Sequence, residues 1–175
     1  MPETSSLNTT TAFEMPFQPV GAGEADRLLR ELDWGEHFVG SSLNPAMGNN
    51  KVYVYSLKEM LRFLTQGGAS LGVLQGSSRV GISWVDPPKL LHWLRASLGD
   101  EELADVIEQS LAQDGEALSM GAANIQAVFA GDTPKAKAYL VQLKAMAELT
   151  QLRIAQLEEA QREAQQAQQA QEEAG

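Results

Sequence analysis

The stretch YLVQLKAMAELTQLRIAQL, from Tyr139 to Leu157, repeats apolar residues at alternating steps of three and four positions. This spacing is a heptad seam, which is narrower than the apolar stripe of a helix lying on a globular body. It predicts a long helix that begins near Pro134 and offers the seam to a partner helix, in another protein or in a second copy of the chain. The residues expected at that interface are Leu140, Leu143, Ala147, Ile154 and Leu157.

The same stretch has a second interpretation of equal weight, in which the helix packs on its own domain. Tyr139, Met146, Leu149 and Leu152 widen the apolar face of the first turns. A continuous helix from residue 134 to 172 would measure about 58 Å at about 1.5 Å per residue, against a body of about 35 to 40 Å, so its end must project. Beyond Leu157 the face holds only alanine, which buries too little area to join two helices, and we expect a solvated, fraying end.

The chain divides into three parts. Residues 1–20 are expected to be a disordered or extended arm, 21–131 a mixed α+β domain, and 132–175 the long helix with its Ala/Gln/Glu-rich end. In the arm, the spacing of Pro16 and Pro19 favours an extended course that packs its aromatic residues on the domain. The first basic residue is Arg27, so secretory and transit signals are not indicated, and we expect a cytoplasmic protein.

The domain is predicted to have an α+β fold, with a small two- or three-stranded sheet packed with about five helices. Strands are expected over 51–56, 69–75 and 79–85, the last two as a β-hairpin, and a loop over 40–50. Helices are expected over 24–32, 57–66, 87–98, 101–113 and 116–131. The uncharged runs at 63–78 and 117–131 are shorter than the roughly 18 residues of a membrane span, so we expect no membrane insertion.

Composition limits the chemistry that the 175 residues can perform. Cysteine is absent, which excludes thiol catalysis and cysteine-bound zinc. His37 and His92 are the two histidines, 55 positions apart, so no local histidine pair exists. Each stands near a tryptophan, Trp34 and Trp93, and we expect both pairs at the edge of the core instead of at a ligand site. No metal or other cofactor is indicated.

One short motif resembles a catalytic sequence. Gly68-Ala69-Ser70-Leu71-Gly72 spells the G-x-S-x-G of a hydrolase nucleophile elbow. That elbow needs a strand before the serine and a helix after it, whereas here a predicted helix comes first and a predicted strand follows. Ser70 is therefore interpreted as part of a turn, and no catalytic residue is predicted.

Charge is unevenly distributed along a chain whose net charge is −10. Between residues 96 and 134 there is no basic residue, and one helical face there carries Glu101, Asp105 and Glu108. Such a face is most often solvated, and it can also receive a basic patch of a partner. Residues 51–85 have the opposite balance, with Lys51, Lys58, Arg62 and Arg79 against Glu59.

Two classes of function are consistent with these patterns. The favoured class is a non-catalytic adaptor or assembly module that self-associates or binds a protein partner. The alternative is a nucleic-acid-binding regulator, in which 57–85 forms a winged-helix-like segment, Lys58, Arg62 and Arg79 contact phosphates, and the C-terminal helix dimerises. The acidic second half of the chain opposes that alternative, because it would repel a phosphate backbone.

Overall fold

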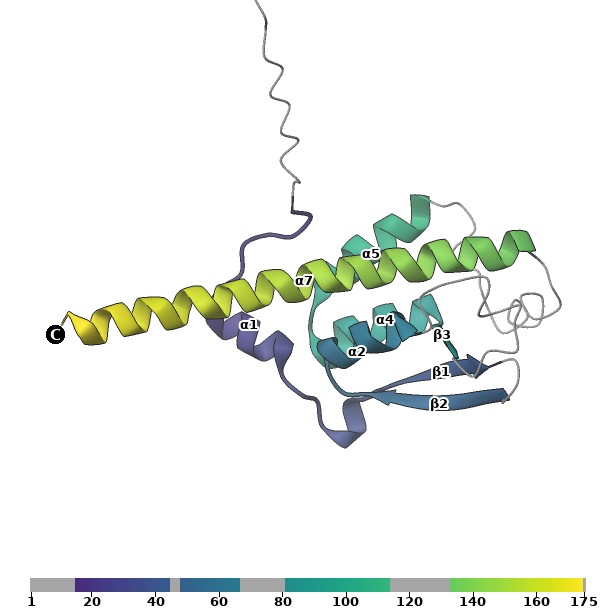
Figure 1. The fold of residues 1–175 in the computed structure, drawn as a ribbon, viewed down its shortest axis with the longest axis horizontal. Coiled ribbons are helices and arrows are strands. Elements are labelled where there is room, and N and C mark those ends of the chain that lie inside the picture. The colour runs from purple at the N-terminus through teal and green to yellow at the C-terminus, as the bar shows by residue number, and fades with distance from the viewer. Residues whose placement is uncertain (1–14, 45–47, 67–80, 114–132, 175) are drawn as a thin grey trace, which may run out of the picture.

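A computed structural model describes residues 15–44, 48–66, 81–113 and 133–174. They form an α+β fold with a three-stranded antiparallel sheet and a long C-terminal helix, as predicted (Figure 1). The order is α1 (Ala22–Leu29), a 3-10 turn (Trp34–Glu36), β1 (Phe38–Asn44), β2 (Gly48–Val54), α2 (Leu57–Leu64), β3 (Ile82–Trp84), α4 (Pro87–Trp93), a π-helical turn (Leu94–Leu98), α5 (Glu101–Gln113) and α7 (Thr133–Glu173). No helix in these residues is long and apolar enough to cross a membrane.

The sheet has the order β2-β1-β3, so β1 is central and β2 lies at one edge. Phe38 pairs with Val54 at one end of the β1–β2 ladder, and Ser42 pairs with Ser83 of β3. The predicted strand over 51–56 corresponds to β2 and the one over 79–85 to β3, which pairs with β1. The strand expected over 69–75 and the helix over 116–131 lie outside the described residues.

The prediction of a loop over 40–50 is wrong, because most of these residues belong to β1 and β2. Their glycine, serine and asparagine content is typical of turns, but contacts distant in sequence determine the strand. Gly40 lies so close to the ring of Phe63 that a Cβ atom there would overlap it. The hydroxyl of Ser42 accepts a hydrogen bond from the Gln66 side chain at 2.7 Å. Small residues therefore let α2 approach the sheet.

α2 lies between the sheet and α7 (Figure 1). Ser56 caps its start by accepting from the amide of Glu59 at 3.2 Å, and the Glu59 carboxylate accepts from the amide of Tyr55 at 2.7 Å. These two contacts resemble a capping box, with the carboxylate reaching the residue before the cap, and they fix where the helix begins. Its buried residues are Leu57, Met60, Phe63 and Leu64.

α7 packs against α1, α2 and α5, and its buried residues run from Tyr139 to Leu157. The C-terminal end, yellow in Figure 1, extends past α1, and its side chains from residue 165 onward are exposed. The predicted long projecting helix is thus present, with its first half inside the fold.

Two buried polar contacts hold α7 in place. The Arg153 guanidinium pairs with both carboxylate oxygens of Asp100 at 3.0 Å, and Asp100 also caps α5 by accepting from the amide of Leu103. Tyr139 donates its hydroxyl to the carbonyl of Ser83 at 2.5 Å and accepts from the amide of Val85 at 3.1 Å. The Phe17 ring lies against Arg153, so the described part of the N-terminal arm packs on the domain as expected.

Candidate functional site

Four aromatic rings gather where the chain enters β1 and leaves β2. Trp34, His37, Tyr53 and Tyr55 have ring centroids 5.2 to 6.1 Å apart in five mutual pairs. Val39 stands directly across from Tyr53 in the β1–β2 ladder. We call these five residues the aromatic patch.

Local structure explains how residues 34 to 55 come together. The amide of Leu32 donates to the carbonyl of Tyr55 at 2.7 Å, which ties the segment before the 3-10 turn to the end of β2. The imidazole of His37 bonds to the carbonyl of Trp34 within that turn. Tyr53 and Tyr55 are two positions apart, so both rings lie on the same side of the extended chain.

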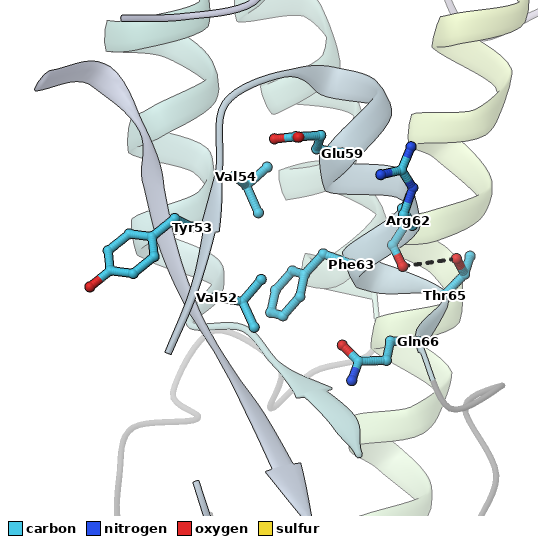
Figure 2. Close-up of a pocket in the computed structure, with 8 residues that line it drawn as sticks. All are labelled: Val52, Tyr53, Val54, Glu59, Arg62, Phe63, Thr65 and Gln66. Atoms are coloured by element: carbon cyan, nitrogen blue, oxygen red, sulfur yellow. Dashed lines mark hydrogen bonds between the residues drawn. The ribbon is translucent and has the colours of Figure 1, made fainter. Parts of the chain in front are cut away.

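Tyr53 points away from α2, on the opposite side of β2 from Val52 and Val54 (Figure 2), so the patch lies on the side of the sheet that faces away from α2. Its exposed side chains are large: Trp34 is 72% exposed, Tyr53 46% and Val39 43%. The other exposed large apolar residues that the structure describes, Met15 and Val141, belong to the arm and to α7. Single exposed apolar residues are ordinary, whereas a cluster of them marks a contact surface.

A hollow of ≈ 420 Å³ adjoins the patch at His37. Lys51 on β2 and Lys89 and His92 on α4 line it, together with the hydroxyls of Ser41 and Ser97. No Asp or Glu is among its described lining residues, although Asp86 pairs with Lys89 at 3.8 Å nearby. The surface beside the patch is therefore basic in a chain that is acidic as a whole.

A second hollow, of ≈ 440 Å³, lies between β2 and α2 and is shown in Figure 2. Val52 and Val54 point from β2 toward Phe63 of α2, while Tyr53 points away to the side of the aromatic patch. We call this hollow the edge groove; its lining residues are Val52, Tyr53, Val54, Glu59, Arg62, Phe63, Thr65 and Gln66.

The residues predicted as a partner interface lie in the core of their own chain. Each is at most 8% exposed, and the helix that carries them packs against α1, α2 and α5. The residues are Leu140, Leu143, Ala147, Ile154 and Leu157. These residues therefore pack against helices of their own chain, as the second interpretation of the seam expected.

The predicted acidic face is partly neutralised within the chain. Arg95 pairs with Asp105 at 2.7 Å and with Glu108 at 2.6 Å, and these hydrogen bonds raise the pKa of the Arg95 guanidinium. Glu101 is exposed at the start of α5. Nowhere in the described ranges do three histidine, aspartate or glutamate side chains meet as a metal site would require.

The three basic residues predicted for nucleic-acid contact have different surroundings. Lys58 pairs with Glu158 of α7 at 2.6 Å, and Arg62 lines the edge groove. Arg79 lies outside the described residues, as does Ser70 with its G-x-S-x-G motif. The structure therefore brings Lys58 and Arg62 together on α2 but beside an acid of α7.

Comparison of the chain with known protein families, with characterised proteins and with solved structures finds no match.

Sequence reasoning missed the aromatic patch. Trp34 was expected at the edge of the core, yet its ring is the most exposed of the large apolar side chains described. The alternation of valine and tyrosine over 52–55 was a usable signal, because it places two tyrosines on the face opposite the valines. Trp93, by contrast, is buried with its indole N–H donating to the carbonyl of Glu36 at 2.8 Å, close to expectation.

Proposed function

We propose that the protein is a non-catalytic interaction module that binds a partner protein through the aromatic patch. The observation that carries the proposal is the position of Trp34, which is 72% exposed and stacks on Tyr53. Tryptophan and tyrosine dominate binding energy at protein interfaces, because each buries a large area with few rotatable bonds.

The surroundings of the patch favour an acidic partner surface. Lys51 and Lys89 line the hollow beside it, and charges at the rim of an interface steer association and select partners. The adaptor role and the cytoplasmic location expected from the sequence remain parts of this proposal. We also propose that the protein self-associates, which a measurement of its mass in solution would test.

The experiment is affinity purification of the tagged full-length protein from its own cells, with mass spectrometry of the eluted proteins. The variant Trp34→Ala with Tyr53→Ala should lose a stoichiometric partner that the unaltered protein retains. Val141→Ala is the matched control, because Val141 is 57% exposed on α7, away from the patch. A partner set unchanged by the double variant would contradict the proposal.

Nucleic-acid binding is the second candidate, and the basic hollow beside stacked rings is the observation in its favour. The pairing of Lys58 with Glu158 weighs against α2 as a recognition helix. This candidate predicts an affinity that falls steeply with salt and is lost in Lys58→Glu with Arg62→Glu. Unchanged binding by that double variant would rule out the winged-helix form of the candidate.

A further inference from the structure

Among the described residues, the outer edge of β2 has no partner strand. β2 spans the seven residues Gly48–Val54 and pairs with β1 on one side only. The amide of Leu32 meets the carbonyl of Tyr55 just beyond the strand, and within the described ranges no further backbone hydrogen bond reaches residues 48–54 from outside the sheet. Unpaired N–H and C=O groups along such an edge are a template for one more strand.

The edge groove lies along that free edge. Its floor is apolar, formed by Val52, Val54 and Phe63, and α2 forms its wall with Arg62 and Glu59 (Figure 2). A strand added to β2 would place every second side chain over this floor, because side chains alternate between the two faces of a strand. The remaining side chains would lie beside Tyr53, within reach of the aromatic patch.

Charge at the groove selects the occupant. Arg62 is exposed and forms no ion pair with another described residue, whereas the carboxylate of Glu59 is already held by the amide of Tyr55. Lys51 is exposed on the other face of β2, where it lines the basic hollow. Both faces of the edge therefore offer a cation to an incoming chain.

We propose that β2 binds an extended segment of a partner protein as a fourth strand. The segment carries apolar side chains at alternate positions, which fill the edge groove, and an aspartate or glutamate that pairs with Arg62. Main-chain hydrogen bonds to β2 supply affinity and the groove supplies specificity. This inference rests on the proposed function and states which kind of segment the partner presents.

The probe is a displayed library of random peptides of about ten residues, long enough to span β2, selected on the full-length protein. We expect enriched peptides to alternate apolar and polar residues and to contain an acid. Arg62→Glu should weaken their binding about tenfold or more, the effect of losing a charge-assisted hydrogen bond. Lys144→Glu is the matched control, because Lys144 is an exposed lysine on α7 and the substitution makes the same charge change.

Amide hydrogen exchange tests the strand itself. Peptide binding should slow every second amide of residues 48–54, those that point to the free edge, and leave the amides of α5 unchanged. Selection of no peptide, equal binding by Arg62→Glu and Lys144→Glu, or β2 amides that do not slow would each overturn the inference. A doubled solution mass, with the same amides protected before peptide is added, would assign the edge to a second copy and also overturn it.

The failures of the two proposals can be told apart. If Trp34→Ala with Tyr53→Ala releases the cellular partner while peptides leave the β2 amides unaffected, the patch binds and the fourth-strand inference falls. If peptides slow the β2 amides but the partner is retained by that variant, the aromatic patch is not the binding surface and the proposed function falls.

Discussion

Arg153 is the largest fully buried side chain that the structure describes, and the pair that it forms with Asp100 joins α7 to the start of α5. Both side chains are at most 2% exposed, so neither charge has water to replace a lost partner. Glu102 adds a second carboxylate at 2.8 Å, and the ring of Phe17 covers the guanidinium. Removing Arg153 would therefore leave the Asp100 carboxylate buried without a cation.

Replacing one member of the pair should be far worse than replacing both. We expect Arg153→Met to lower the free energy of unfolding by about 3–5 kcal/mol, because it leaves the Asp100 carboxylate buried and unpaired. Arg153→Met with Asp100→Asn should recover part of that loss, since the amide can still cap α5. Urea unfolding measures both. Equal losses in the single and double variants would show that the coupling is absent.

The buried phenol of Tyr139 makes the stability of the fold depend on pH in the alkaline range. Burial raises the pKa of its phenol, although the hydrogen bond from the Val85 amide acts in the opposite direction. Because the folded pKa lies above the ordinary value of 10.0, the stabilisation is complete below that pH and is lost as the pH rises beyond it.

The matched substitution is Tyr139→Phe. It should cost about 1–3 kcal/mol at neutral pH, because the amide of Val85 loses its acceptor. It should also flatten the fall in the urea midpoint above about pH 10. A midpoint that falls with pH as steeply in Tyr139→Phe as in the unaltered protein would assign that fall to other groups.

The seam of α7 was predicted correctly as a helix face, but its neighbour could not be read from its spacing. The apolar side chains of a three-four repeat can be buried by any set of helices that packs on them. Here α1, α2 and α5 of the same chain bury them. The identity of the covering helices depends on how residues distant in sequence fold back.

Two substitutions on α7 distinguish packing within the chain from packing on a partner. Leu143→Asp places a carboxylate where the side chain is fully buried, and should destabilise the fold by more than about 4 kcal/mol. Val141→Asp, on the exposed side of the same turn, should change stability by less than about 0.5 kcal/mol. Thermal unfolding together with the solution mass measures both. A stable Leu143→Asp protein of reduced mass would instead mean that the seam serves an oligomer.

The strands show where sequence patterns fail. The alternation over 51–56 and 79–85 identified β2 and β3, because those strands carry valine, isoleucine and aromatic residues. β1 was missed because it contains small residues such as Gly40 and Ser42, which local patterns assign to turns. These residues are small because α2 packs closely against them, and that contact between distant segments cannot be read from a local pattern. The pairing of Arg153 with Asp100, 53 positions away, was hidden for the same reason.

The described helices cover the two sides of the sheet unevenly. α2 and then α7 cover one side of the sheet, while the other side carries the aromatic patch. In the part of the chain that the structure describes, β2 pairs along one edge only. The described helices thus pack their apolar faces against one another. Most of the exposed large apolar side chains that the structure describes lie between residues 34 and 55. This distribution supports the proposed interaction role, because a cluster of exposed apolar residues on a rigid scaffold marks a contact surface.

Site-specific photo-crosslinking in the protein's own cells would show whether a partner contacts the aromatic patch. A photoreactive phenylalanine would replace Tyr53 in the patch and, in a second variant, Val141 on α7. We predict a discrete crosslinked protein from position 53 and none from position 141. Crosslinks from neither position, or the same products from both, would contradict the proposal that the protein binds its partner at the aromatic patch.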